Sequence, residues 1–122
     1  TFTTLEMLAG TLRQTSTGVI TTANVSGGTV YVDAGTLTTA NLRGGDARVE
    51  WISTITLTNC NVYRGYFDAS KGAQARTITN SEVHHGGVIN TYNGLDNIVK
   101  TTTTKKYGGQ VIDVAGAVAY YP

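Results

Sequence analysis

Short runs in which apolar and polar residues alternate recur along the chain. Val30-Tyr31-Val32 and Ile55-Thr56-Leu57 are examples. A period of two is typical of a strand with one buried face. Thr, Val, Ile and Tyr, which suit a pleated surface, are abundant, whereas the helix formers Glu, Lys and Leu are sparse. The pattern therefore predicts an all-β protein.

A six-residue unit with a glycine three residues after it occurs five times. Residues 57–62 read LTNCNV and precede Gly65, and the same frame fits residues 2–7, 20–25, 37–42 and 78–83. Spacings of 17 to 21 residues separate the apolar positions that end each unit, which are Met7, Val25, Leu42, Val62 and Val83. A repeat of this length indicates a stack of similar coils of chain.

Two further apolar columns accompany these anchor positions. The column five residues before the anchor is Phe2, Ile20, Leu37, Leu57 and Ile78, and the column five residues after it is Leu12, Val30, Ala47, Phe67 and Val88. Glycine doublets punctuate the repeat where a corner needs positive φ, at Gly27-Gly28, Gly44-Gly45, Gly86-Gly87 and Gly108-Gly109. We therefore predict a parallel β-helix (β-solenoid) of 5–6 short coils with a triangular cross-section, about three strands per coil, and coils roughly 4.8 Å apart.

Two other columns are expected inside the stack. One holds the small residues Ala23, Ala40, Cys60 and Ser81, and the other holds Thr22, Thr39, Asn59 and Asn80. Stacked Thr or Asn side chains can hydrogen-bond to their counterparts one coil away. Cys60 is then a buried filler rather than a reactive thiol.

The phrase Leu57-Thr58-Asn59-Cys60-Asn61-Val62, with Gly65 after it, resembles the coil consensus of right-handed parallel β-helices of the pectin-lyase-like superfamily. That superfamily includes polysaccharide lyases and hydrolases and many trimeric bacteriophage tailspikes. The resemblance covers residues 2 to about 94 and implies right-handed coils. It concerns the fold, because the coils are shorter than is usual in those enzymes and none of their catalytic motifs is matched.

Residues 1–122 are expected to form a single domain, with regular coils over 2–94 and an irregular last coil and C-terminal cap over 95–122. The apolar tail would cover the open end of the core. The alternative is that the tail packs against another subunit. Tyr120, Tyr121 and Trp51 are the candidate subunit-interface residues, because Tyr and Trp bury large areas while keeping a polar tip.

Charge and cysteine content narrow the function classes. Nine basic and eight acidic side chains give a net charge of +1, which provides no electrostatic footprint for nucleic acid or an anionic membrane. No apolar run approaches the roughly 20 residues that span a bilayer. The single cysteine cannot form an internal disulfide. We therefore expect a soluble protein made in a cytoplasm.

Two groups of side chains are candidates for chemistry. Asp33 and Glu50 are expected to stack on neighbouring coils, with Asp68 on the next coil but out of phase with them. Stacked carboxylates could serve glycoside cleavage or bind a cation. The second group is Arg43, Tyr63 and His84, one residue after the anchor, with Arg64 and His85 beside them. These five form a candidate ligand or partner face for a carboxylate, a phosphate or an acidic sugar, with Tyr63 stacking on a sugar ring.

Each group also has a purely structural interpretation. The acidic residues would then lie on a solvated face, and the Arg43 column would form a polar corner or a salt-bridging contact between subunits. The two adjacent histidines point to different sides of a strand, and no third His or Cys completes a zinc site. We therefore expect no catalytic residue, no cofactor and no metal.

Three functions compete. The first is a structural bacteriophage virion protein, a homotrimeric capsid decoration, cement or fibre component at the virion surface whose partner is the major capsid protein or another virion protein. The alternative is a tailspike-like carbohydrate-binding or polysaccharide-degrading module whose partner is a glycan. Ice binding is suggested by Thr56-Leu57-Thr58 and Thr77-Ile78-Thr79, but coil lengths that vary from 17 to 21 residues argue against a regular threonine array.

Overall fold

The computed structural model describes residues 2–15, 17–52, 56–72, 74–92 and 98–112. These residues form strands and no helix. The strands are β1 (Phe2–Met7), β2 (Thr11–Gln14), β3 (Val19–Val25), β4 (Thr29–Val32), β5 (Thr36–Trp51), β6 (Thr56–Asp68), β7 (Arg76–His84), β8 (Gly87–Asn90), β9 (Ile98–Lys100), β10 (Lys105–Tyr107) and β11 (Gln110–Ile112).

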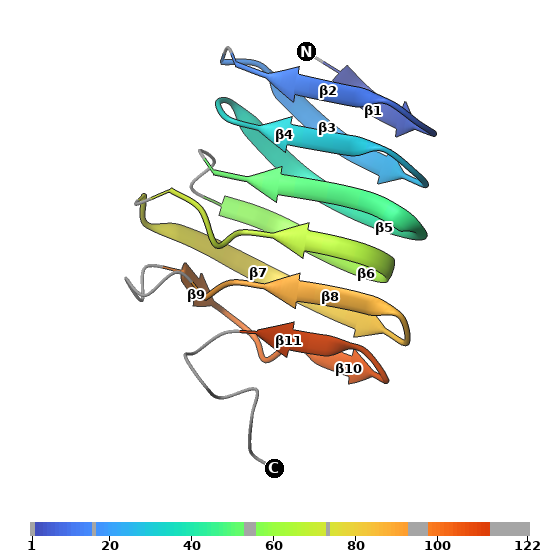
Figure 1. Cartoon of the computed structure of the whole chain (residues 1–122). Coiled ribbons are helices and arrows are strands. Elements are labelled where there is room, and N and C mark those ends of the chain that lie inside the picture. Colours follow the sequence, from blue (N-terminus) through green and yellow to red (C-terminus); the bar gives the residue numbers. More distant parts are fainter. Residues whose placement is uncertain (1, 16, 53–55, 73, 93–97, 113–122) are drawn as a thin grey trace.

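All the paired strands are parallel, and each coil lies directly on the next (Figure 1). The anchor residues are in register from coil to coil, with Met7 opposite Val25, Val25 opposite Leu42 and so on to Val83. The chain is therefore a parallel β-solenoid of about five turns, which confirms the predicted fold class.

The strands of a coil meet at corners, and the longer strand also bends along its length. Ile20 and Ala23 are buried, but the two residues between them, Thr21 and Thr22, both point outward. Two successive outward residues break the period of two and turn the strand there. In the last coil the same two segments are separate strands, β9 and β10, both of which pair with β7.

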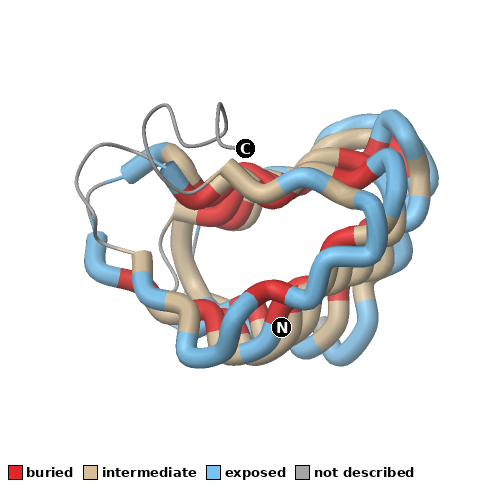
Figure 2. Tube along the Cα trace, turned by 90° about the horizontal axis from the view of Figure 1, so that it is seen from below, coloured by how far each residue is buried: buried red, intermediate tan, exposed pale blue. Residues whose placement is uncertain are grey.

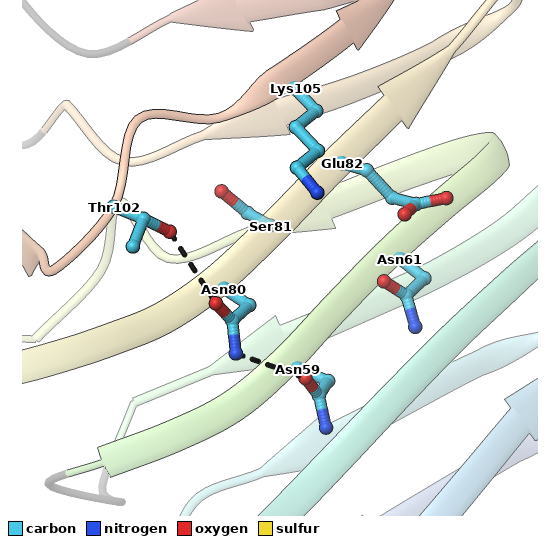
Figure 3. A pocket seen from close by; sticks show the side chains of 7 residues that line it. All are labelled: Asn59, Asn61, Asn80, Ser81, Glu82, Thr102 and Lys105. Carbon is cyan, nitrogen blue, oxygen red and sulfur yellow. Dashed lines mark hydrogen bonds between the residues drawn. The ribbon is translucent and has the colours of Figure 1, made fainter.

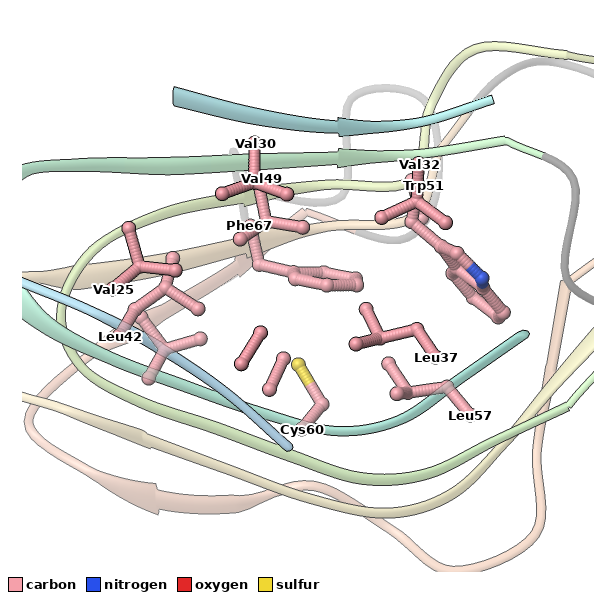
Figure 4. Close-up of a cluster of buried hydrophobic side chains, with 14 of the residues drawn as sticks. Val25, Val30, Val32, Leu37, Leu42, Val49, Trp51, Leu57, Cys60 and Phe67 are labelled. Atoms are coloured by element: carbon pink, nitrogen blue, oxygen red, sulfur yellow. The ribbon is translucent and has the colours of Figure 1, made fainter. Parts of the chain in front are cut away.

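The interior of the stack is a continuous apolar core. Figure 2 looks along the stack and shows the buried residues lining the inside of the superposed coils. Trp51 and Phe67, whose ring centroids are 6.0 Å apart, face Leu37, Leu57 and Cys60 across the interior (Figure 4). Cys60 is fully buried, as predicted, and burial raises the pKa of its thiol.

Two members of the predicted third column are wrong. Val49 and Ile89, rather than Ala47 and Val88, lie in register with Phe67. The corner after the anchor holds additional residues in these two coils, and a register shift follows Leu42. Val88 consequently aligns with Tyr66 and is only half-buried, whereas Ala47 is buried inside the corner.

Glycine is required at the tight corners. Gly28 has φ +82°, and a Cβ there would lie 2.5 Å from the carbonyl oxygen of Gly10 in the coil next to it. The stacked corners are too close for a side chain, and the left-handed backbone disfavours one as well. The expected positive φ is therefore confirmed at this corner.

Three other expectations need correction or fall outside the described residues. Trp51, a candidate subunit-interface residue, is fully buried in the core of a single chain. Its side chain cannot contact another subunit, because Val32, in register with it, and Phe67 enclose it.

Tyr120 and Tyr121 lie outside the described residues, so the capping or subunit role of the tail stays a prediction. The Thr22, Thr39, Asn59 and Asn80 column is on the outer surface rather than inside.

Arg76 is buried, and no pattern in the sequence predicts this. Its side chain is 2% exposed, and its guanidinium donates to the carbonyl oxygens of Trp51, Ala69 and Lys71. Trp51 is the last residue of β5, and Ala69 and Lys71 lie in the loop that follows β6. Arg76 therefore takes the place of backbone N–H groups at this corner.

Candidate functional site

The outer face of β3, β5 and β6 carries a ladder of asparagine side chains, one position before the anchor. Asn24 Nδ2 donates to Glu6 Oε2 at 2.6 Å, Asn41 Nδ2 donates to Asn24 Oδ1 at 2.9 Å, and Asn61 Nδ2 donates to Asn41 Oδ1 at 2.9 Å. Parallel register places each amide directly beside the next. We call Asn24, Asn41 and Asn61 the amide ladder.

The amide ladder stops where the residue type changes. Glu82 occupies the next position in this column, opposite Asn61. An ionised carboxylate only accepts hydrogen bonds, so Glu82 cannot donate to Asn61 Oδ1 as the preceding asparagines donate to their neighbours. Glu82 Oε2 is instead 2.8 Å from His84 Nε2. In the last coil, Lys105 follows Glu82 in register.

A shallow polar pocket of about 230 Å³ lies where the ladder stops (Figure 3). The side chains that line it come from β6, β7, β10 and the segment before β10, and they are Asn59, Asn61, Asn80, Ser81, Glu82, Thr102 and Lys105. Figure 3 shows the amino group of Lys105 pointing toward the β7 side chains. Amide, hydroxyl, carboxylate and ammonium groups thus meet in one depression.

A second line of polar contacts forms the other wall of this pocket. Asn59 Nδ2 donates to Thr39 Oγ1 at 3.3 Å, and Asn80 Nδ2 donates to Asn59 Oδ1 at 3.4 Å. Thr102 Oγ1 donates to the Thr79 carbonyl at 2.9 Å. The predicted hydrogen bonds between coils are therefore confirmed for Thr39, Asn59 and Asn80, and these two bonds are longer than those of the amide ladder.

Arg43, Tyr63 and His84 come together as the sequence predicts. The Arg43 guanidinium carbon lies 5.0 Å from the Tyr63 ring centroid, and the Tyr63 and His84 centroids are 4.8 Å apart. Tyr107, which the sequence analysis missed, stacks on His84 at 4.8 Å. Lys106 occupies the anchor position of the last coil, opposite Val83, so Tyr107 comes one residue after the anchor, as Tyr63 and His84 do. Extending the repeat to this coil would have identified Tyr107. We call Arg43, Tyr63, His84 and Tyr107 the aromatic strip.

Arg64 and His85 do not belong to the aromatic strip. Both are exposed and lie beside the glycine corners, where a Cβ on Gly86 would approach Arg64 and a Cβ on Gly108 would approach His85. They extend the basic character of this edge of the solenoid. The five predicted face residues are therefore neighbours, but only three of them stack.

Two of the three acidic residues, Glu50 and Asp68, form a closed ion-pair cluster on another face of the solenoid. They lie in register, so the expectation that Asp68 is out of phase with Glu50 is wrong. Tyr31, and not Asp33, is in register with Glu50, and Asp33 is paired with Arg13, so the expected stack of Asp33 on Glu50 is wrong as well. Arg48 bridges the two carboxylates at 3.1 and 2.9 Å, and Lys71 Nζ is 3.0 Å from Glu50 Oε1. Both carboxylates are thus held by cations.

The ion pairs determine how Glu50 titrates. Burial disfavours its charged form, but the hydrogen bonds from Lys71 and Arg48 outweigh burial and lower its pKa below the ordinary value. A general acid at neutral pH needs a raised pKa instead. Glu50 is therefore suited to holding the coils together, and its environment opposes a role as a proton donor.

Among the described residues, no group of three or more His, Cys, Asp or Glu side chains could hold a metal ion. Within the same residues there is also no helix long and apolar enough to cross a membrane.

No protein-family model, no curated protein and no solved structure matches this chain. The parallel β-solenoid architecture therefore rests on the structure itself. The resemblance to the pectin-lyase-like superfamily and the virion role remain hypotheses.

Proposed function

We propose that the chain is a structural bacteriophage virion protein, a homotrimeric capsid decoration, cement or fibre component that acts through protein contacts and not through catalysis. The resemblance of its coil sequence to trimeric virion β-helices supports this role. A solenoid with a continuous apolar core and backbone pairing between its described coils is a rigid scaffold suited to it.

The observation that carries the proposal is the aromatic strip. It runs along the solenoid axis over four coils, and Tyr107 at its end is 54% exposed. Arg and Tyr are the side chains most favoured at protein interfaces. A strip parallel to the axis matches a neighbouring solenoid that lies parallel to this one, as subunits do around a threefold axis. We assign the strip to the subunit contact.

The test is the absolute mass in solution, measured by light scattering before and after heating. We expect a trimer for the wild-type chain and a monomer for the double variant Tyr63→Ser, Tyr107→Ser. Tyr92→Ser, which changes a tyrosine that is 38% exposed and lies outside the strip, is the matched control and should remain trimeric. A wild-type monomer, or a double variant that stays trimeric, would contradict the assignment.

A further inference from the structure

The pocket at the end of the amide ladder contains the side-chain oxygen of Asn61, which receives no hydrogen bond from the side chain in register with it in the next coil. Each asparagine of the ladder donates to the residue in the preceding coil, so Asn61 is the last donor and its Oδ1 points toward the next coil. The side chain in register there is the carboxylate of Glu82. Two acceptors therefore face one another, and a group with O–H donors fits between them.

The size and lining of the pocket fit a sugar ring. Its volume of about 230 Å³ is below the roughly 300–1,000 Å³ of sites for drug-sized ligands. A sugar hydroxyl both donates and accepts, so it can donate to Asn61 Oδ1 or Glu82 and accept from the amide of Asn80 or the ammonium of Lys105. A purely apolar or purely cationic ligand would leave some of these groups unsatisfied.

The charges around the pocket favour an anionic sugar. Lys105 lines it and Lys106 follows in the same strand, while Arg43 and Arg64 lie in register with each other on β5 and β6, two and three residues after Asn41 and Asn61. Among the described residues of the lining, Glu82 alone is acidic, and His84 contacts it. Cations around a concave site attract anions, and an ammonium at its rim can bind a carboxylate directly.

We propose that this pocket binds a carboxylate-bearing sugar residue of an acidic polysaccharide. The ring hydroxyls lie between Asn61 and Glu82, and the sugar carboxylate pairs with Lys105. Binding involves no bond cleavage. The site is separate from the proposed subunit contact, because the pocket lining and the aromatic strip share no residue.

The experiment is a binding screen of the full chain against oligosaccharides that contain uronic or sialic acids. Each is presented beside a counterpart whose carboxylates have been reduced to alcohols. We expect at least one acidic oligosaccharide to bind about tenfold more tightly than its reduced counterpart. Absence of binding to every acidic member at millimolar concentration would overturn the proposal, and so would equal binding of the reduced counterparts.

Two variants locate the site. Lys105→Met and Asn80→Ala, at exposed positions of the lining, are each expected to weaken binding about tenfold while leaving the melting temperature unchanged. Lys106→Met is the matched control, since it removes the same charge from a residue outside the lining. Equal losses for Lys105→Met and Lys106→Met would show that net charge alone attracts the ligand, which would overturn the proposal.

Two further measurements separate this proposal from its alternatives. Poly-glutamate, which carries carboxylates but no sugar ring, should bind at least tenfold more weakly than the acidic oligosaccharide. Equal binding would indicate an acidic protein partner and would contradict a saccharide site. The double variant Tyr63→Ser, Tyr107→Ser should lose the trimer but keep the saccharide, and loss of both would contradict the separation of the two sites.

Discussion

On two surfaces of the solenoid, polar side chains of successive coils stack in register, and the two stacks are stabilised in different ways. Both stacks lie on a parallel sheet. The amide ladder uses neutral, identical residues, whereas the other face uses the alternating charges of Arg48, Glu50, Asp68 and Lys71. The charged cluster is closed, because each carboxylate is held by cations. The amide ladder is directional, so it must end, and its end is where the pocket lies.

This difference suggests a division of roles. The closed cluster has its carboxylates at 10% and 5% exposure and offers little to a ligand. The open end of the ladder offers acceptors, an ammonium group and space. We therefore assign the cluster to stability and the ladder end to recognition, and the variants below test that assignment from the largest expected effect to the smallest.

The closed cluster should be the more costly to break. Arg48→Ala removes the cation that bridges Glu50 and Asp68, and we expect it to lower the free energy of unfolding by about 3 kcal/mol. Urea denaturation at fixed protein concentration measures this. Arg13→Ala breaks the ion pair with Asp33, in which the Arg13 side chain is 52% exposed, and should cost less than about 1 kcal/mol. Equal effects would contradict the contrast between the two pairs.

Acid should weaken the cluster selectively. Because the pKa of Glu50 is lower in the folded state than the ordinary 4.5, its contribution is present above pH 4.5 and is lost as the pH falls through the folded value. We expect Glu50→Gln to be less stable than the wild type by about 2 kcal/mol at pH 7. The two unfolding free energies should converge as the pH falls below 4.5. A difference that stays constant with pH would refute this interpretation.

Asparagines in the middle of the amide ladder should contribute moderately to the free energy of unfolding. Asn41→Ala removes the hydrogen bond to Asn24 and the one from Asn61, and we expect a loss of about 1 kcal/mol. Asn80→Ala removes two long bonds at an exposed position, the one to Asn59 at 3.4 Å and the one from Thr102 at 3.5 Å, and should change the unfolding free energy by less than about 0.5 kcal/mol. Both are measured by urea denaturation. An Asn80 variant as damaging as the Asn41 variant would show that the two columns do not differ.

The amide ladder should become one hydrogen bond longer when an asparagine is placed at its end. Glu82→Asn places an amide where Asn61 Oδ1 has a carboxylate opposite it, and the new Nδ2 can donate to that oxygen. We expect a gain of about 0.5 kcal/mol in the unfolding free energy, because one added surface hydrogen bond contributes little. The same variant should weaken binding of the acidic oligosaccharide, since the ladder then supplies the donor itself. Lower stability with unchanged binding would contradict the account.

Repetition explains how much of the fold the sequence could predict. The columns through Ile20, Leu37, Leu57 and Ile78 were identified correctly because each coil repeats the same inward position. The third column failed at Ala47 and Val88, because corners of different length shift the frame and a corner's length is not visible in apolar spacing. Trp51 was misplaced because the core beside it is wide enough to hold an indole ring.

The candidate site was partly predictable for the same reason. Arg43, Tyr63 and His84 were grouped by their shared position after the anchor, and they stack. Tyr107 and Lys105 were missed because the four-threonine run before them obscured the last copy of the repeat. The buried role of Arg76 has no sequence signal, since it depends on the folded positions of three carbonyl groups, one at the end of β5 and two in the loop after β6.

The most direct test of the central claim is an NMR titration of the wild-type chain with the acidic oligosaccharide that binds most tightly, following the side-chain amide signals of the asparagines. The account predicts that the signals of Asn61 and Asn80 shift with increasing ligand, while that of Asn24, near the other end of the ladder, does not. Shifts confined to residues around Arg48 and Glu50, or no shift at Asn61, would contradict the claim that the end of the amide ladder is the recognition site.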